Sequence, residues 1–491
     1  MRFLERREFI QQSVGLASLV AAGYFADDAE AGQQPRPAQP NPRGANERLN
    51  VAVIGVRGRG RDHISGLAGR HNCRVTHLCD VDTAVTASAV TLAQKAQGGA
   101  APVVVGDLRR IMDNKDIHIV TVATPNHWHS LAGIWAMQAG KHVYVEKPVS
   151  HNVWEGRRLV EASRHYNKIC QAGTQIRSQP GIRQAIEYIR SGQLGACTVA
   201  RGLCYKPRGS IGRCNGNQRP PATMNYDLWC GPAANRPPHR NGRFGTVHYD
   251  WHWIWEYGNG DLGNQGIHQM DVARWGLGKS ELARSAISLG GRFGYTDDGE
   301  TPNTQLCVFD YGNADLIFEV RGLRTDPYRG ASIGNIFHCA NGYVAFVNYS
   351  TAIAFDNNNR ELRRFTGGGD HYGNFVRAIR SGRRQDLHGE VLEGHLSSAL
   401  CHLANISYRL GRQVAFDRRN GALGENREAN ETLTRTIAHL RGNNVALDSA
   451  MLTIGRRLNV DVRNETFGDD RAANAMLTRE YRKGFVVPAR F

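Results

Sequence analysis

The sequence predicts a two-domain α/β protein whose first folded domain contains a parallel sheet. Its 491 residues are too many for one ordinary domain. A buried-type strand over residues 49–54 turns through several glycines into an expected helix. Further strand-like segments follow, each ending in a polar loop, with helix-like segments between them. This alternation is typical of parallel strands that are covered by helices.

The residues before the first strand predict export rather than a folded element. The segment "MRFLERREFIQQSVGLASLVAAGYFADDAEAG" contains Arg6-Arg7, Phe9, a mildly apolar stretch over 13–22 and the small-residue pattern Ala29-Glu30-Ala31. We interpret residues 1–31 as a twin-arginine signal peptide, with a chance amphipathic helix as the alternative. Residues 32–48 are rich in proline and predict a linker. The protein would then engage the export machinery through its N-terminus and be periplasmic.

The composition is that of a globular protein, with 41% hydrophobic and 22% charged residues. The formal net charge of +16 would suit an acidic partner, but we see no dense Lys/Arg tract and no nucleic-acid-binding motif, so we expect no nucleic acid. The 10 cysteines form no CxxC pair and predict neither a zinc nor a thioredoxin-like site. Cys204, Cys214 and Cys230 would either pair after export or remain free or buried thiols.

The segment "LNVAVIGVRGRGRDHISGLAG" predicts a dinucleotide-binding turn. Gly55, Gly58 and Gly60 depart from strict GxGxxG spacing, but glycines at this turn still let a pyrophosphate approach the N-terminus of the following helix. The next strand, "CRVTHLCDVD", ends in Asp80 at about the interval expected for the acid that binds a ribose. A carboxylate at this position repels a 2′-phosphate, so we predict NAD rather than NADP.

Two more strand ends complete this Rossmann domain. One is followed by Thr124-Pro125-Asn126-His127 and a helix, and the other ends in Glu146-Lys147-Pro148. Ligands of an open parallel sheet lie at the carboxyl ends of its strands, where both loops would meet. The alternatives are loop packing for His127 and a solvated surface charge for Lys147.

The stretch "GNGDLGNQGIHQMD", residues 258–271, predicts a site. Its glycines argue against an ordinary helix or strand in the first half, and they would let the backbone approach a ligand closely. His268 is suited to proton transfer near neutral pH. Asp271 would share a face with His268 if the second half is helical.

Together these motifs resemble the Gfo/Idh/MocA oxidoreductases. The glycine turn, "ATPNHWH", "EKP" and "GDLGNQGIHQMD" carry the resemblance, which extends over the chain after residue 49. It implies a Rossmann domain followed by an α+β domain with an open, mostly antiparallel sheet that covers the cofactor cleft and often supports homo-oligomers. We therefore expect an NAD-binding domain over 49–173, a substrate-binding domain over 174–430 and a C-terminal extension over 431–491 that packs back on the body.

The resemblance also implies roles for single residues. Lys147 would position the substrate hydroxyl, and His268 would be the general acid/base. The family often has Asp where this chain has Asn264, whose amide can only hydrogen-bond, so Asp261 or Asp271 would have to substitute. The expected cofactor-binding residues are Gly55, Gly58, Arg59, Gly60, Asp80, Thr124, Pro125, Asn126, His127, Glu146 and Lys147. The expected substrate-binding residues are Asn264, Asp271, and Trp251 and Trp253 as a platform for a sugar face, although at least one of these aromatics should be core.

The remaining elements are read from their patterns. Strands are expected over 197–205, 283–293, 304–311, 315–321 and 343–348, and helices within 371–382 and 389–411. His371, His395 and His402 are expected to be core or surface residues. His248, Asp250 and His252 alternate as on a strand face, but no further ligand cluster is evident, so we predict no metal site.

Three functions are compatible with these features. The first is an exported NAD(H)-dependent oxidoreductase that acts on a hydroxyl of a sugar, sugar derivative or polyol. It would retain its cofactor, since no abundant NAD pool exists outside the cytoplasm. The second is an NAD-dependent glycosidase, similar to α-N-acetylgalactosaminidases, that uses transient oxidation, elimination and re-reduction. The third is a non-enzymatic sugar-binding protein with a vestigial cofactor cleft, against which Lys147, His268 and Asp80 argue.

Overall fold

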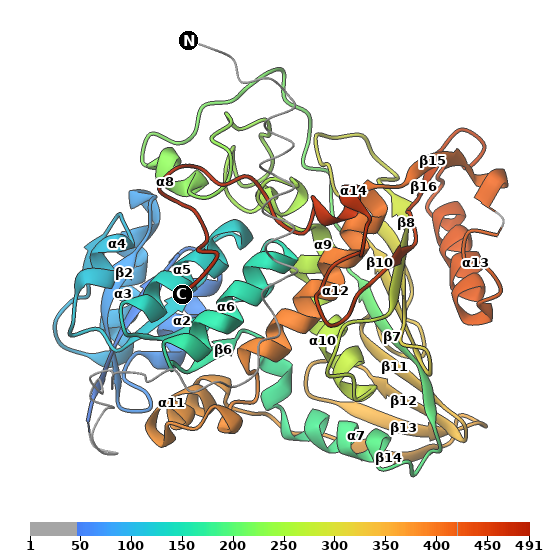
Figure 1. Cartoon of the computed structure of the whole chain (residues 1–491), viewed down its shortest axis with the longest axis horizontal. Helices are drawn as coiled ribbons and strands as arrows, with labels where there is room; N and C mark the ends of the chain where they lie inside the picture. The colour runs from blue at the N-terminus through green and yellow to red at the C-terminus, as the bar shows by residue number, and fades with distance from the viewer. Residues whose placement is uncertain (1–46, 420) are drawn as a thin grey trace. The chain divides into compact units, whose positions relative to one another are not determined.

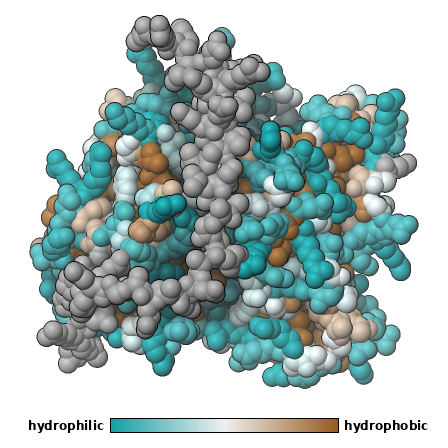
Figure 2. Space-filling model, viewed as in Figure 1, coloured by the Kyte–Doolittle hydropathy of each residue, from teal (hydrophilic) through white to brown (hydrophobic). Residues whose placement is uncertain are grey.

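The computed structural model describes residues 47–419 and 421–491. The expected signal peptide and all but two residues of the expected linker lie outside the described residues. Within the described part, no helix is long and apolar enough to cross a membrane. The face seen in Figure 2 is largely hydrophilic, with small separate groups of hydrophobic residues, as is usual for a protein surface.

The first sheet confirms the Rossmann prediction. Its six parallel strands have the order β3-β2-β1-β4-β5-β6, which is that of a doubly wound dinucleotide-binding sheet (Figure 1). The strands are β1 (Leu49–Ile54), β2 (Cys73–Cys79), β3 (Val103–Val105), β4 (Ile119–Val122), β5 (His142–Val145) and β6 (Cys170–Ala172). Helices α4 (Arg109–Asp113), α5 (Asn126–Gln138) and α6 (Val153–His165) share one core with the sheet; α2 (Arg59–Leu67) and α3 (Thr86–Gln97) share another.

The second sheet has 11 strands and is antiparallel except where β7 pairs with β10. Ten of them follow the order β14-β13-β12-β11-β7-β10-β9-β8-β16-β15, and β17 pairs with β8. Their bounds are β7 (Cys197–Tyr205), β8 (Ser285–Gly291), β9 (Thr304–Asp310), β10 (Asp315–Arg321), β11 (Ile333–Cys339), β12 (Gly342–Phe346), β13 (Ala352–Asp356), β14 (Glu361–Phe365), β15 (Arg412–Ala415), β16 (Met451–Ile454) and β17 (Leu458–Asn459). The expected open, mostly antiparallel sheet is confirmed.

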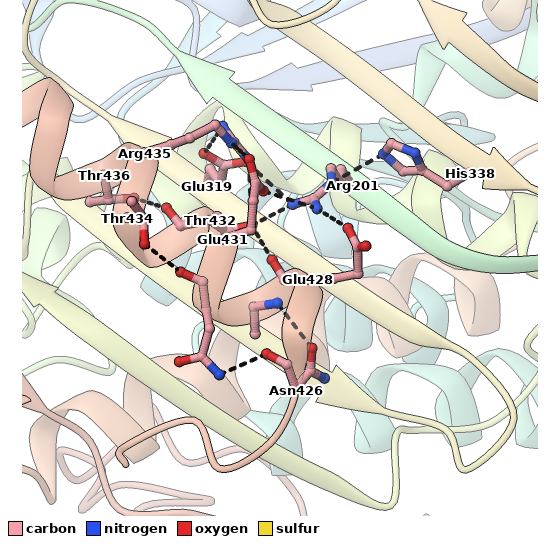
Figure 3. A network of polar contacts seen from close by, with 12 residues as sticks. Arg201, Glu319, His338, Asn426, Glu428, Glu431, Thr432, Thr434, Arg435 and Thr436 are labelled. Atoms are coloured by element: carbon pink, nitrogen blue, oxygen red, sulfur yellow. Dashed lines mark hydrogen bonds and ion pairs between the residues drawn. The ribbon is translucent and has the colours of Figure 1, made fainter. Parts of the chain in front are cut away.

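Helices cover both faces of the second sheet. On one face α7 (Pro180–Arg190), α10 (Gly266–Gly276) and α12 (Val391–Arg409) contribute to the largest apolar core. On the other, α13 (Arg427–Gly442) packs its apolar side over β8, β9 and β10. Polar contacts also hold α13: Arg435 lies 2.8 Å from buried Glu319 of β10, and Arg201 of β7 lies 2.5 Å from Glu428 (Figure 3). Burial alone would raise the pKa of Glu319, but Arg321 and Arg435 lower it, so this carboxylate stays charged.

The chain crosses between the two layers more often than the expected boundaries allow. Helix α11 (His371–Ser381) lies within the expected 174–430 domain but packs in a core of the first sheet. The boundary expected after residue 430 falls inside α13, and β16 and β17 of the expected extension pair with β8. The extension does return to the first domain, where the ring of Phe485 lies 5.6 Å from that of Trp128.

Candidate active site

A cavity of about 300 Å³ opens at the carboxyl ends of β1, β2, β4 and β5. This is the edge at which a parallel α/β sheet binds its ligand. Most of the predicted cofactor residues line it, whereas Gly60 and His127 do not. The predicted residues in its lining are Gly55, Gly58, Arg59, Asp80, Thr124, Pro125, Asn126, Glu146 and Lys147.

The three glycines of the first turn are needed for two reasons, the backbone conformation of the turn and space in the cavity. Gly55 has φ +80, and a Cβ there would lie 2.7 Å from the Ala123 carbonyl oxygen. A Cβ on Gly60 would lie 1.8 Å from the Gly55 oxygen, so both positions need glycine for the turn itself. A Cβ on Gly58 would meet nothing within 4 Å. Gly58 precedes α2 and lines the cavity, so it leaves room for a pyrophosphate at the helix N-terminus.

Asp80 stands at the end of β2 with its carboxylate held by the backbone. Val56 N donates to one oxygen at 2.8 Å and Asp82 N to the other at 3.0 Å. Burial raises the pKa of Asp80, although these two bonds oppose the shift. The remaining lone pairs of the carboxylate are available to ribose hydroxyls at the cavity edge. The residues present therefore fit NAD.

Substituting Asp80 with asparagine is expected to reduce the preference for NAD over NADP by at least about tenfold, because a nearby negative charge disfavours the 2′-phosphate. Titration of both cofactors against apo-protein measures the ratio. Asp107→Asn, at another carboxylate that lines the cavity, is the matched control. Tighter binding of NADP than NAD by the unsubstituted protein would contradict the assignment.

Glu146 is an anchor rather than a free ligand group. Its carboxylate lies 2.9 Å from Arg59 Nε and 3.1 Å from His63 Nε2, and it accepts a hydrogen bond from Gln175 at 3.0 Å. Burial would raise the pKa of Glu146, but the hydrogen bond to His63 and the charge of Arg59 hold it well below its usual range. The charged Glu146 therefore fixes Arg59 and the end of β5 beside the cavity.

Lys147 joins the first domain to the glycine-rich stretch. Its Nζ donates to the backbone oxygen of Asn264 at 2.8 Å. Burial lowers the pKa of Lys147, while neighbouring Glu146 opposes the shift. The Asn264 amide instead contacts Asp261 at 3.4 Å, so Asn264 meets Lys147 through its main chain. A partly buried lysine with a lowered pKa is suited to exchanging a proton with a substrate hydroxyl.

His268 lies in the first turn of α10, which begins at Gly266, so the second half of the stretch is helical. The first half contains the short helix α9 (Gly260–Asn264), which corrects the expectation that its glycines exclude a helix. His268 is 6% exposed, and its Nδ1 is buried without a hydrogen-bond partner among the described residues. Burial lowers the pKa of His268 well below its usual value, and the charge of Lys147 adds to this. The imidazole is thus neutral at neutral pH and able to accept a proton.

The carboxylates expected to support His268 are engaged elsewhere. Asp271 accepts two bonds from Arg177, at 2.7 and 2.8 Å, and one from Ser397 at 2.7 Å. Asp261 is bound by Arg208 through two bonds of 2.8 Å. The expectation that Asp271 binds substrate or orients His268 is therefore wrong, because both of its oxygens serve a buried ion pair that ties α10 to the segment before α7.

Arg177→Met is expected to lower the free energy of unfolding by about 3–5 kcal/mol, because Asp271 would be left in a buried position without its main ion-pair partner. Denaturant unfolding followed by circular dichroism measures the loss. Arg364→Met, which removes an exposed pair with Glu361, should cost only about 0–1 kcal/mol. Equal losses in the two variants would contradict this account.

The two tryptophans and His127 have different surroundings. Trp251 lines the cavity and stacks on His252 with centroids 3.6 Å apart. Trp253 is buried, with the Arg208 guanidinium 5.3 Å from its ring, and is a core residue rather than a platform. His127 is buried too; its Nε2 lies 2.9 Å from the Trp229 oxygen, and burial lowers its pKa to about 3. His127 therefore packs the loop rather than contacting a cofactor.

Sequence reasoning missed that residues 206–259, hereafter the 206–259 segment, cross the open edge of the first sheet. Asn225 N donates to Val81 O at 2.8 Å, and His248 Nε2 lies 2.7 Å from Asp82. Figure 1 shows α8 (Tyr226–Cys230) of this segment beside the first domain. The segment contributes Leu228, Trp229, His248, Tyr249, Trp251 and His252 to the cavity lining. The aromatic run of this segment was the only sequence feature that suggested a role at the site, and it did not indicate that the segment contacts the first domain.

A polar cluster beside His268 was also missed. Lys206, just after β7, donates to Gln265 at 3.0 Å, and Gln265 bonds the hydroxyl of Tyr349. The Tyr349 ring lies 5.3 Å from that of His268. The cluster thus surrounds His268 with groups that can bind hydroxyls. No group of three or more potential ligands within the described residues could hold a metal ion.

Two family models match most of the chain. Residues 49–174 match the Gfo/Idh/MocA model described as "Oxidoreductase family, NAD-binding Rossmann fold". Residues 200–441 match the model described as "Oxidoreductase family, C-terminal alpha/beta domain".

Among curated proteins, levoglucosan dehydrogenase of Pseudarthrobacter phenanthrenivorans is 36% identical over 96 residues, 20% of this chain and 25% of that protein. Alpha-N-acetylgalactosaminidase of Shewanella oneidensis is 25% identical over 206 residues, 40% of this chain and 44% of that protein. The matches therefore span less than half of either relative. A solved levoglucosan dehydrogenase in complex with NADH and levoglucosan has a TM-score of 0.56 at 19% identity, covering 73% of this chain and 96% of that one.

Proposed function

This chain belongs to the Gfo/Idh/MocA oxidoreductase family, and on that basis we propose that it is an NAD-dependent enzyme acting on a hydroxyl of a sugar, sugar derivative or polyol. The observation that carries the proposal is the position of Lys147. Its partly buried ammonium lies at the cofactor cavity and bonds the backbone of Asn264, four residues before the neutral imidazole of His268. Oxidation of a hydroxyl releases one proton along with the hydride, and Lys147 and His268 are both able to exchange that proton.

The chain's residues would divide the reaction between them. Gly58 and Asp80 would hold NAD, which supplies the hydride acceptor when bound. Lys147 would bind and orient the substrate hydroxyl. His268 would take its proton, because a neutral imidazole can act as a base. Trp251 and the Lys206–Gln265–Tyr349 cluster would bind the rest of the substrate. The sugar-related names of the matched relatives support this substrate class.

We propose further that the cofactor is retained through turnover. The 206–259 segment lines the cavity from the side opposite the sheet and bonds the residues just after Asp80. A dinucleotide between the sheet and this segment could leave only if these contacts opened. Cofactor retention is also compatible with export through a signal peptide at residues 1–31. We propose this export, and we propose assembly into homo-oligomers.

The cofactor content of purified protein tests retention and separates an enzyme from a non-enzymatic sugar-binding protein. We expect the denatured protein to release NAD(H) in a stoichiometric amount. We also expect catalysis to need no added NAD in proportion to the product formed. His248→Ala, which removes the contact with Asp82, should speed dinucleotide loss. Release of one NADH into solution for each molecule of product would contradict cofactor retention. Protein that purifies without dinucleotide and has no affinity for NAD would contradict the proposal that it is an enzyme.

A second candidate is a redox-neutral glycosidase, favoured by the similarity to alpha-N-acetylgalactosaminidase over 206 residues. Lys147 and His268 would then manage the hydroxyl proton of a transient ketone before elimination of the leaving group. The products decide between the candidates: a glycosidase releases an aglycone and a sugar with no net oxidation. In deuterated water it would also place deuterium on the carbon next to the oxidised centre.

A further inference from the structure

Two cysteines face each other across neighbouring strands of the second sheet. Cys197 begins β7 and is the register partner of Cys339, the last residue of antiparallel strand β11. Both side chains are half-buried, and neither has a part in the proposed reaction. All 10 cysteines, including Cys204, Cys214 and Cys230, are free thiols in the structure.

The two cysteines lie beside an irregularity of the strand register. The pairing of β11 with β7 skips Thr198 between His338 and Cys339, and Cys197 and Cys339 are partners beyond it. One residue outward on each strand, Ala340 N donates to Ala196 O at 3.1 Å, so the strands are still joined there. Opposite residues of antiparallel strands have Cα atoms about 4.5–5.5 Å apart, which lies inside the range of roughly 4.4–6.8 Å in which disulfides form.

The two thiols also interact directly. The hydrogen bond between them lowers the pKa of Cys339 and raises the pKa of Cys197. The thiolate is the form that attacks a disulfide. Half-burial leaves the pair within reach of a small oxidant, so either thiol can make the first attack.

We propose that Cys197 and Cys339 form a reversible disulfide by exchange with a disulfide-bearing oxidant. The thiolate of one cysteine attacks one oxidant sulfur, forming a mixed disulfide, and the other oxidant sulfur leaves as a thiolate. The thiolate of the second cysteine then attacks the sulfur of the first, and the bound oxidant sulfur leaves as a thiolate. The two cysteines lose two electrons and two protons, and the oxidant gains them as two thiols.

The cross-link would constrain a long part of the chain. It closes the loop between residues 197 and 339, which contains β8, β9, β10, α9 and α10. Closing a long loop stabilises a fold chiefly by restricting the unfolded chain. It would also join β11 covalently to β7, which ends just before Lys206, the residue that donates to Gln265. The pair would be closed in an oxidising compartment and open in a reducing one.

The test uses the purified full-length protein in glutathione buffers that range from fully reduced to fully oxidised. Free thiols are blocked with N-ethylmaleimide before mass spectrometry. In oxidised buffer we expect the protein to lose two hydrogens and to bind two fewer maleimides. A non-reducing digest should yield peptides joined through Cys197 and Cys339. The oxidised protein should also have a higher thermal midpoint of unfolding, and dithiothreitol should reverse both changes.

Two variants test which cysteines form the cross-link. Cys214→Ser, at a half-exposed cysteine of the 206–259 segment, should leave the cross-link unchanged. Cys197→Ser should leave Cys339 open to alkylation or carrying one glutathione. Complete alkylation of both cysteines in oxidised wild-type protein would overturn the proposal, and so would a cross-link between other cysteines. Since the wild-type protein decides the outcome, a poorly folding variant does not obscure it.

Discussion

Replacing His268 with asparagine is expected to lower turnover by about a hundredfold to ten-thousandfold, the usual contribution of a general acid/base. Asparagine keeps a polar side chain at this position but cannot exchange a proton. Bound NAD should remain, because His268 does not line the cavity described above. Steady-state kinetics, with the dinucleotide content measured on the same sample, check both parts.

The pH profile tests the same assignment independently. Because burial holds the pKa of His268 well below 6.5, the neutral base is present from neutral pH downward until the pH approaches that pKa. Titration of His268 should therefore make the oxidation rate fall on the acid side, with a midpoint below pH 6.5, and His268→Asn should remove this limb. His239→Asn, at an exposed histidine of the 206–259 segment, is the control. Unchanged turnover in His268→Asn would refute the role of His268.

Substituting Lys147 with methionine is expected to lower kcat/KM by a similar factor of about a hundred to ten thousand. Methionine fills nearly the same volume but loses the bond to the Asn264 carbonyl and any contact with a substrate hydroxyl. Arginine should not restore activity, since a guanidinium cannot give up its proton near neutral pH. Kinetics of the three proteins, with circular dichroism as a check of folding, measure the effect.

Lys95→Met provides the matched control for Lys147, because Lys95 is an exposed lysine of the same domain, on α3. It should behave as the unsubstituted protein. Recovery of most activity by Lys147→Arg would show that Lys147 supplies only positive charge, and the assignment of proton exchange to it would fall.

Local patterns were sufficient for much of the fold. The β1–Gly55–Gly58–α2 unit was predictable because a buried strand, a glycine turn and a helix are all specified within about twenty residues. The strands β7 and β10 were predicted with their observed bounds. In the second sheet β11, β13, β14, β15, β16 and β17 were missed. An edge strand such as β14, with its exposed Arg363 and Arg364, has no apolar alternation. Helix α9 was not expected because of its glycines, of which Gly260 packs closely against Thr301.

Some features of the candidate site were likewise predictable from the sequence, and others were not. The chemical identity of Lys147, His268 and Asp80, and the Gly58 opening, were determined by the sequence, because each sits in a short motif whose chemistry is local. Only the tertiary structure decided that Asp271 and Asp261 are occupied by Arg177 and Arg208, that Trp253 and His127 are buried, and that the 206–259 segment covers the cofactor edge. The physical reason is that these outcomes depend on partners about 50 to 170 residues away in the chain. A side chain's sequence neighbours do not specify which distant charge or backbone group will compete for it.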